Sequence, residues 1–379
     1  MTLQYDKPVL FAKFIEKDIL SEMGRLLFYI LNIFSINGYR IKLFANIDFE
    51  GLEKDCPYIR LVESIDNLEM VNTIPDDSHN MVYLFDKTDK GCARKNWAKK
   101  YQVKFNIFSS YFWSSINQSH PIIIPYPMHP LHYDADLPER LNTARENDKK
   151  IRIFFSGDTE GYTRNRINYP TTKLTRVEIV DAILQEMNDR VVPVSDLEGQ
   201  NKLLEGEYIE KCVIVDNGKF RIDAKAWLET LSKADFFLCP PGYVMPMCHN
   251  VIEAMAVGTI PIINYPEWLN PDLIDKVNCI SFDSKADLIK KITNVLTMKR
   301  EEIDEMRTRV IEYYQNNLDP AGFMKKLEAN ADKEMTLLMI TDAHVAKNET
   351  MLNKNSVLIN GTPRLPSDIW KDIRNKIGI

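Results

Sequence analysis

The sequence predicts an α/β protein made of two doubly wound domains that face each other across a cleft. The chain has 379 residues, 45% hydrophobic and 27% charged, a length that suits two domains of about 100–200 residues each. Continuous apolar runs typical of buried parallel strands alternate with amphipathic helices. This alternation occurs once before and once after a proline-broken, highly charged segment, which places the boundary between the domains there.

The first domain is predicted over residues 1–135. Between its first two strands, apolar side chains recur at helical spacing from Ile19 to Phe34, and Gly38 ends that helix. The strands of this domain are expected at Pro8–Lys13, Arg40–Ala45, Met81–Phe85, Val103–Phe108 and Pro121–Ile124.

A linker follows at 136–150, and the alternation restarts in a second domain at 151–330. Its strands are expected at Arg152–Phe155, Val191–Val194, Cys212–Val215, Phe236–Cys239, Thr259–Ile263 and Cys279–Phe282. Its helices are expected at Lys173–Met187, Ala224–Ser232 (with Asp223 as N-cap), Cys248–Val257, Ala286–Met298 and Glu301–Asn317. Residues 331–379 form an extension, in which Thr336–Thr341 is a strand or a buried helix and Pro366–Ile379 ends in a helix.

Composition excludes several classes of protein. The longest apolar run, Leu26–Ile36, is about half the length of a membrane span, and no secretory signal precedes it. The net charge of −6 argues against a nucleic-acid binder. The six cysteines form no C-x-x-C pair, so we expect free thiols in a reducing compartment, no metal site and a cytoplasmic location.

One stretch departs from this charge balance. Residues 87–104 carry seven Lys or Arg side chains against the single acid Asp89. The ordinary interpretation is a solvated helix face. The alternative is a surface for an anionic acceptor or for peripheral contact with a membrane.

The segment Ala224–Tyr265 carries the clearest chemistry. A buried strand ends in Pro240-Pro241-Gly242, so the chain turns sharply and its backbone is able to approach a ligand closely. The next helix begins near Cys248, and its free N–H groups and positive dipole end favour a phosphate or diphosphate. His249 and Asn250 lie at that helix start and are candidates to hydrogen-bond the ligand, although Asn250 also suits a helix cap.

Glu253 falls in the second turn of the same helix, among apolar neighbours. A carboxylate in such surroundings needs partners, and two ribose hydroxyls one turn inward from a diphosphate would supply them.

The order S-K-A-D-F-F-L-C-P-P-G-Y … E-A-M-A-V-G-T-I-P-I-I resembles the nucleotide-sugar-binding half of GT-B glycosyltransferases, and within them it is similar to the exostosin-like group. The resemblance extends over Phe154–Leu318. It implies a UDP- or GDP-linked sugar donor bound by the second domain, an acceptor bound by the first, and no required cofactor or metal. It also implies that Glu253 holds the ribose and that Gly242, Tyr243 and Cys248 line the diphosphate.

Two departures from the family pattern shape the expected mechanism. Met245 stands eight positions before Glu253, where retaining members carry a second Glu, so we expect inversion. Pro241 stands where the exostosin-like pattern has Arg, so the positive charge facing the diphosphate must come from elsewhere. Arg164, Arg166, Lys173 and Arg176 are the candidates, beyond the glycine turn at Gly157 that follows a predicted strand, and Lys173 and Arg176 are favoured.

The catalytic base is predicted less sharply. An inverting transfer needs a carboxylate or imidazole within hydrogen-bond reach of the acceptor hydroxyl. Glu16 and Asp18, in the loop after the first strand, and His129, in the hinge, are the candidates favoured here. Glu22, Asp86 and His132 are further possibilities. The D-x-D triplet Asp134–Asp136 follows no apolar strand, so it is interpreted as a linker turn and not as a metal site.

These patterns predict a glycosyltransferase, a hexosyltransferase or a related enzyme of polysaccharide biosynthesis. It would move a sugar from a nucleoside-diphosphate donor to a glycan or glycolipid acceptor. The alternative is a non-catalytic nucleotide-sugar or glycan-binding module of the same fold. A periplasmic-type solute binder is disfavoured because no signal peptide is visible.

Overall fold

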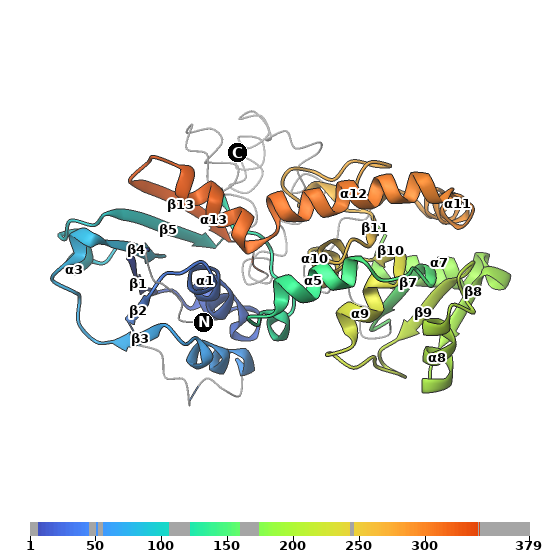
Figure 1. Ribbon diagram of the computed structural model, residues 1–379, viewed down its shortest axis with the longest axis horizontal. Helices are drawn as coiled ribbons and strands as arrows, with labels where there is room; N and C mark the ends of the chain where they lie inside the picture. The colour runs from blue at the N-terminus through green and yellow to red at the C-terminus, as the bar shows by residue number, and fades with distance from the viewer. Residues whose placement is uncertain are drawn as a thin grey trace, which may run out of the picture. The chain divides into compact units, whose positions relative to one another are not determined.

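The computed structural model describes residues 7–44, 51, 56–105, 122–159, 174–242, 246–339 and 341 (Figure 1). These residues divide into two compact units. The first unit contains the described residues up to Ala135 and those from Asn316 onward, and the second unit contains those within Asp136–Gln315. Each unit is built on one parallel sheet, which confirms the prediction of two doubly wound α/β domains.

The first unit has a seven-stranded sheet in the order β3-β2-β1-β4-β5-β13-β6, and every pair is parallel. Its strands are β1 (Val9–Lys13), β2 (Ile41–Phe44), β3 (Leu68–Val71), β4 (Met81–Phe85), β5 (Lys99–Phe105), β6 (Ile122–Ile123) and β13 (Glu334–Met339). The chain runs outward from β1 to β3 and then returns to β4 on the other side of β1. This is a Rossmann-like order with its switch point between β1 and β4.

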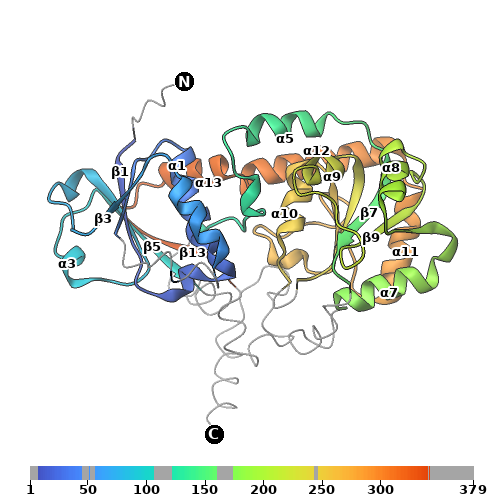
Figure 2. The same ribbon diagram turned by 90° about the horizontal axis from the view of Figure 1, so that it is seen from below.

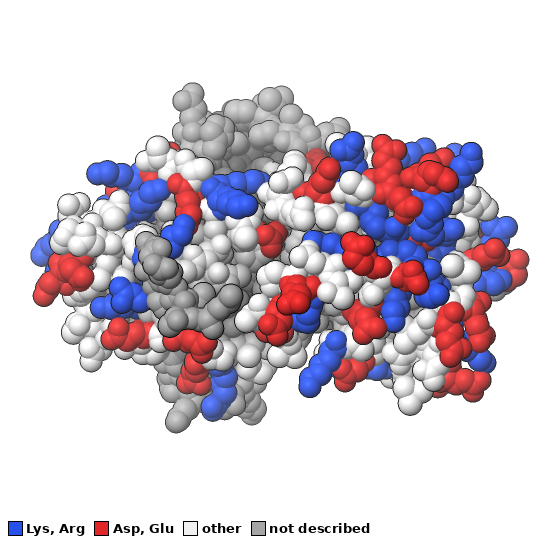
Figure 3. Space-filling model, in the orientation of Figure 1, with Lys and Arg blue, Asp and Glu red and all other residues white. Residues whose placement is uncertain are grey.

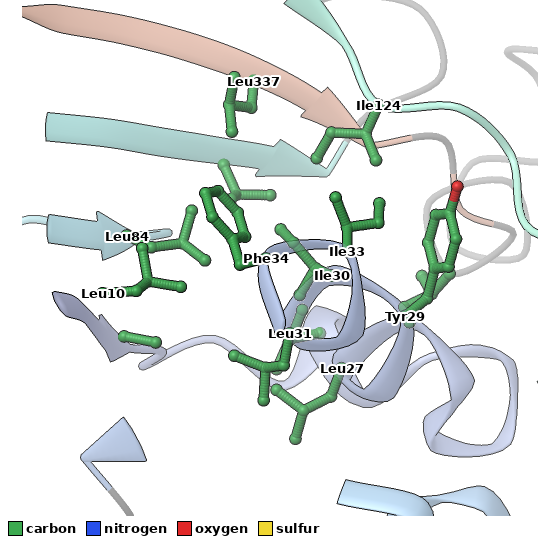
Figure 4. Close-up of a cluster of buried hydrophobic side chains, with 14 of the residues drawn as sticks. Leu10, Leu27, Tyr29, Ile30, Leu31, Ile33, Phe34, Leu84, Ile124 and Leu337 are labelled. Atoms are coloured by element: carbon green, nitrogen blue, oxygen red, sulfur yellow. The ribbon is translucent and has the colours of Figure 1, made fainter. Parts of the chain in front are cut away.

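Alternation along the strands fills both faces of this sheet. Leu10 of β1 packs into the larger core with Leu84 of β4, whereas Phe11 points to the opposite face and stacks on Trp97 at 5.3 Å. Helix α1 (Arg25–Ile36) covers the larger core, and Figure 4 shows its Phe34 side chain directed toward Leu84 of β4. Helix α13 (Pro320–Ala329) contributes Phe323 to the same core, and α3 (Lys90–Ala93) contributes Cys92 to the other.

Helix α1 begins later than the apolar spacing predicts. Two short 3₁₀ helices, η1 (Lys17–Leu20) and η2 (Glu22–Gly24), precede it. Glu22, Met23 and Gly24 have φ angles of 56°, 62° and 84°, and left-handed residues cannot continue a right-handed helix. The apolar side chains from Ile19 onward therefore reach the core from two different elements.

The second unit has a six-stranded parallel sheet in the order β12-β11-β10-β7-β9-β8. Its strands are β7 (Ile151–Gly157), β8 (Val191–Val194), β9 (Cys212–Asp216), β10 (Ala234–Cys239), β11 (Ile260–Ile263) and β12 (Ile280–Ser281). Every residue of β10 is buried, as expected for a central strand covered on both faces. The connections from β7 and from β10 run in opposite directions across the sheet, so the switch point lies between these two strands.

Helices surround this second sheet, and Figure 2 shows α5 beside α9. Their bounds are α5 (Leu137–Arg145), α7 (Arg176–Glu186), α8 (Leu197–Glu205), α9 (Trp227–Ser232), α10 (His249–Ala256), α11 (Lys285–Leu296) and α12 (Arg300–Asn317). The remaining 3₁₀ helices of the chain are η3 (Pro57–Ser64), η4 (Ser78–Asn80), η5 (Pro130–His132), η6 (Asn188–Arg190) and η7 (Pro266–Trp268).

Several elements differ from the sequence-based expectations. The 136–150 stretch, predicted as a linker, contains α5, whose Leu137 and Leu141 are buried. Asp223 is not the N-cap of α9, because the helix starts at Trp227 and the Asp223 carboxylate accepts from the backbone N–H of Lys225 in the preceding turn. The strand-or-helix alternative near 336–341 is a strand, β13, that joins the first sheet beside β5. The predicted terminal helix lies outside the described residues.

The basic stretch 87–104 is also not one helix face. It runs through α3 and then into β5. Lys95 and Lys100 form ion pairs with Asp76 and Glu334 at 3.0 and 2.7 Å, so part of its charge is compensated within the first unit. Over the second unit, Figure 3 shows Lys and Arg side chains interspersed with Asp and Glu.

All six cysteines are free thiols, as predicted. Within the described part of the chain, none of the helices is both long and apolar enough to span a bilayer.

Candidate functional site

The carboxyl edge of the second sheet, at its switch point, brings together most of the residues predicted to bind the donor. Gly157 ends β7 and Cys239 ends the neighbouring β10. The loop from Pro240 follows, and α10 then begins at His249 with Cys248 as its N-cap. Open parallel sheets bind their ligands at this position, beyond the strand ends.

Arg176 is the buried cation of this edge. It is the first residue of α7, whose start is fixed by a capping box between Thr175 and Glu178. Its side chain donates from Nε to the carbonyl of Pro241 and from Nη1 to the carbonyl of Asp158, both at 3.2 Å. Arg176 therefore links the loop after β7 to the loop after β10 and holds a guanidinium charge between them.

Gly157 permits the close approach of these loops. A Cβ atom at this position would lie 3.3 Å from Nη1 of Arg176 and 2.9 Å from Cζ of Phe155. A larger residue at position 157 would press first on the Phe155 ring and then on the arginine. The role of Gly157 in the approach to a phosphate stays a prediction.

The start of α10 is held close to the same charge. The N–H of Gly242 donates to the carbonyl of Pro246 at 3.1 Å and closes the loop after β10. Cys248 is the N-cap of the helix, and its Sγ donates to Oδ1 of Asn250 at 3.6 Å. A cavity of about 10 Å³, only just large enough to admit one water molecule, lies between Arg176, Cys248 and Asn250, and its walls are completed by Phe155, Phe237, Cys239, Pro240, Val251 and Tyr265.

The pKa values of the two cysteines at this edge shift in opposite directions and indicate its electrostatic character. Burial raises the pKa of the Cys239 thiol well above its ordinary value. Burial acts in the same direction on Cys248, but the positive charges of His249 and Arg176 and the N–H of Asn250 outweigh it, so the pKa of Cys248 is lowered. The start of α10 is therefore an electropositive environment that favours an anion.

Glu253 is enclosed by protein. Its carboxylate is 0% exposed; Oε2 accepts from the indole Nε1 of Trp227 at 2.6 Å, and Oε1 contacts Nδ1 of His249 at 2.9 Å. The role of Glu253 in binding ribose stays a prediction. The sequence gives no local signal for Trp227 as its partner, because the two residues belong to different helices, α9 and α10.

Two residues of the predicted site, Lys173 and Tyr243, lie outside the described part of the chain, as do Met245, Arg164 and Arg166.

The candidate bases lie in the first unit, at two places. Glu16 and Asp18 lie between β1 and α1, and Glu16 is exposed. His129 caps η5, where its Nδ1 accepts from the N–H of Leu131 at 3.4 Å, and its Nε2 contacts the hydroxyl of Tyr58 at 2.9 Å. Their roles as bases stay predictions.

Two further carboxylates organise the carboxyl edge of the first sheet. Asp86, at the end of β4, is 5% exposed and accepts from the backbone N–H groups of Ile15, Glu16 and Lys87 at 2.6–3.0 Å. Glu22 lies in the left-handed run before α1 and accepts through Oε2 from Arg25 and from the hydroxyl of Tyr126. The Glu22 network depends on backbone angles that the sequence pattern does not indicate.

The D-x-D triplet lies in an exposed turn before α5. Among the residues that the structure describes, no three His, Cys, Asp or Glu side chains are grouped as metal ligands would be.

The described geometry defines a protein of two Rossmann-like α/β units with an electropositive, glycine-lined strand edge in the second. No family model and no curated protein sequence matches this chain. Several solved structures are similar to it. A glycosyltransferase from Rickettsia africae has 12% identity and a TM-score of 0.47, with 91% of this chain and 100% of that chain covered.

The HepE protein of Anabaena, solved with UDP and glucose, has 12% identity and a TM-score of 0.40, covering 84% of this chain and 98% of its own. WaaG, a glycosyltransferase of lipopolysaccharide biosynthesis, has 11% identity and a TM-score of 0.36 with the same coverage. At these levels of similarity none of them assigns a role to a residue of this chain.

Proposed function

We propose that this protein is a GT-B glycosyltransferase, similar to the exostosin-like group, that transfers a sugar from a UDP- or GDP-linked donor to a glycan or glycolipid acceptor. The observation that carries the proposal is the electropositive start of α10 at the switch point, with the buried Arg176 beside it. A helix N-terminus and a guanidinium together suit a diphosphate, which carries several acceptor oxygens and negative charge.

The proposal gives each donor-site residue a role. The N–H groups at the start of α10, with Cys248, His249 and Asn250, bind one phosphate, and Arg176 with Lys173 binds the other. Gly157, Gly242 and Tyr243 line the approach to the diphosphate, and Glu253 holds the ribose. Positive charge fixed before the reaction stabilises the nucleoside diphosphate as negative charge develops on it.

The proposed chemistry is a direct displacement without a metal. A base, for which Glu16, Asp18 and His129 are the candidates, takes the proton from an acceptor hydroxyl. The acceptor oxygen attacks the anomeric carbon as the bond from that carbon to the phosphate oxygen breaks. The electron pair of that bond leaves with the nucleoside diphosphate, and the configuration of the sugar inverts.

The basic stretch 87–104 is proposed to meet an anionic acceptor or a membrane surface from a cytoplasmic location. Its exposed cations are Lys87, Lys90, Arg94 and Lys104. Nucleic acid is not proposed as a partner.

The test is a panel of UDP- and GDP-linked sugars, with released nucleoside diphosphate measured with and without glycan acceptors and with and without EDTA. The proposal expects release that increases with one class of acceptor and is unchanged by EDTA. Binding of a donor without release would instead identify a non-catalytic nucleotide-sugar-binding module. No binding of any member of the panel would contradict the proposed donor site.

A further inference from the structure

Three consecutive residues before α1 have left-handed backbone angles. Glu22, Met23 and Gly24 have φ angles of 56°, 62° and 84°. Such angles suit glycine, but they are sterically unfavourable for glutamate and methionine. Surrounding contacts must therefore hold this segment in place, and residues held in this way are frequent at binding and catalytic sites.

Close packing fixes the segment and separates its side chains. A Cβ atom at Gly24 would lie 3.1 Å from the backbone nitrogen of Ile59 and 3.2 Å from Cβ of Cys56, so η2 packs directly against the start of η3. The Glu22 side chain is 2% exposed, whereas Met23 is 50% exposed. The carboxylate of Glu22 is thus held inside the protein, directly beside an exposed residue.

This buried carboxylate is hydrogen-bonded at one oxygen only. Oε2 accepts from Nε of Arg25 at 2.6 Å and from the hydroxyl of Tyr126 at 3.0 Å. Oε1 is buried, and no residue in the described part of the chain donates to it. Because a buried carboxylate oxygen without a donor is unfavourable, Oε1 suits a hydrogen-bond donor that comes from a ligand.

The charge around Glu22 limits the kind of donor that fits. Arg25 contacts Oε2 through both Nε and Nη2, so the negative charge of Glu22 is already compensated. A cationic ligand would bring a second positive charge that no further carboxylate of this network balances. A neutral hydroxyl group adds no charge and forms a strong hydrogen bond to a carboxylate.

The position of the network also suits a ligand. It lies in the connection from β1 to α1, at the switch point of the first sheet, where doubly wound sheets bind their ligands. The half-buried Tyr58 lies on η3, and the ring of Tyr126 lies 5.8 Å from the Arg25 guanidinium. Aromatic walls with a few fixed polar groups are typical of small-molecule sites.

We propose that Oε1 of Glu22 accepts a hydrogen bond from one hydroxyl of the acceptor saccharide, a hydroxyl other than the one that reacts. Arg25 and Tyr126 hold the carboxylate in the orientation for this contact. This inference rests on the proposed function, because it names a residue that binds the acceptor. Glu22 does not remove a proton in this role, so the candidates for the base are unchanged.

The first experiment uses the natural protein, with its methionine methyl groups labelled with ¹³C. The methyl glycosides of glucose, galactose, mannose and N-acetylglucosamine are titrated by NMR, with and without UDP. Because Met23 is exposed directly beside Glu22, its signal, assigned by its loss in Met23→Leu, should shift with at least one glycoside. Met70, exposed on the edge strand β3, is the control signal and should not shift.

The second experiment tests the carboxylate itself. Glu22→Gln keeps the size of the side chain and one oxygen for Arg25 and Tyr126, but it replaces the other oxygen with an NH₂ group. We expect this variant to bind the responsive glycoside about tenfold more weakly, with its affinity for UDP unchanged. Glu63→Gln, at an exposed position of η3, is the matched control and should bind like the natural protein.

Deoxy analogues of the responsive glycoside identify the hydroxyl. One analogue should bind the natural protein and Glu22→Gln with equal affinity, because it lacks the group that Oε1 contacts. If every analogue loses affinity in Glu22→Gln to the same extent as the parent glycoside, the proposed contact is wrong.

The remaining outcomes separate this inference from the proposed function. A glycoside that binds without shifting the Met23 signal, or no binding of any glycoside, would overturn the inference. A lower melting temperature of Glu22→Gln with unchanged glycoside affinity would also overturn it, in favour of a structural role. If Glu22→Gln does not fold, the titration of the natural protein still decides the question. Failure to bind UDP would instead contradict the proposed function.

Discussion

The carboxyl edges of the two sheets share a topology but differ in charge. Each edge lies at the switch point of a Rossmann-like sheet, between β1 and β4 in the first unit and between β7 and β10 in the second. In the first unit, the buried groups at this edge are the carboxylates of Asp86 and Glu22. In the second unit, the buried cation Arg176 lies beside the start of α10.

This difference separates two uses of the same position in the fold. The carboxylate of Asp86 accepts from backbone N–H groups, so it stabilises the loop that follows β1. The charge of Arg176 joins two loops through their carbonyl oxygens and leaves the edge electropositive. The buried carboxylates of the first edge stabilise loops, whereas the positive charge of the second edge suits the binding of an anion.

The largest expected effect tests the structural role of Asp86. Asp86→Ala removes the acceptor for three backbone N–H groups, so we expect the free energy of unfolding to fall by about 3 kcal/mol. Denaturant unfolding and hydrogen exchange of the β1–α1 loop measure this. Asp86→Asn keeps one acceptor oxygen and should lose less. A change below about 1 kcal/mol in Asp86→Ala would show that the loop does not depend on this carboxylate.

The next effect tests the anion site of the second unit. Arg176→Met removes the buried charge, so we expect UDP to bind about 10- to 100-fold more weakly, corresponding to about 1.4–2.7 kcal/mol. Arg176→Lys keeps the positive charge but not the planar guanidinium group. Its affinity for UDP should therefore lie between those of the natural protein and of Arg176→Met. Arg309→Met, on the exposed face of α12, is the matched control. Equal affinities for UDP in Arg176→Met and Arg309→Met would contradict the role of Arg176.

A third prediction concerns the charged side chains at the amino ends of the strands in the second unit. At the amino ends, the buried Asp235 pairs with Arg300 at 2.6 and 2.8 Å and with Arg307 at 2.6 Å. Lys149 lies in the same cluster and donates to the carbonyl of Ser232. Burial, together with the charge of Arg307, lowers the pKa of Lys149 to about 8.

An unfolded lysine titrates near 10.4, so between about pH 8 and 10 the unfolded chain binds a proton that the folded protein has lost. The Lys149 contribution to stability therefore rises with pH in that window, by about 2 kcal/mol between pH 8 and 10, and is constant well below pH 8. Urea unfolding of the protein and of Lys149→Met should diverge only above pH 8. Parallel curves up to pH 10 would show that Lys149 is not desolvated.

The smallest expected effect is a difference in reactivity between the two thiols at the carboxyl edge of the second sheet. The pKa of Cys248 is lowered by nearby positive charge and that of Cys239 is raised by burial, so Cys248 carries more thiolate at neutral pH. Alkylation by iodoacetamide, followed by mass spectrometry, should label Cys248 severalfold faster than Cys239, and UDP should slow the labelling of Cys248. Preferential labelling of Cys239 would contradict the electrostatic difference.

Local sequence patterns are sufficient to predict the central strand and helix of the second unit. The apolar run of β10, the Pro-Pro-Gly turn and the start of α10 are adjacent in sequence, and β10 with α10 forms where the pattern predicts. Arg176, Gly157 and the loop after β10 come together because each follows or precedes a strand end of one sheet. Parallel topology alone brings such positions to one edge.

Other features depend on contacts that no local pattern reveals. Strand β13 lies beside β5, more than 200 residues earlier in the chain, and its short apolar run fits a strand or a helix equally well. The left-handed backbone of Glu22 and Met23 occurs in residues that rarely adopt it. The burial of Glu253 by Trp227 is set by how α9 and α10 pack against each other.

The most direct measurement is a crystal structure of the protein with UDP. The account predicts that the diphosphate oxygens lie within hydrogen-bond distance of the first N–H groups of α10 and that Arg176 lies beside them. UDP bound at the β1–β4 edge of the first unit, or bound away from both α10 and Arg176, would contradict the account.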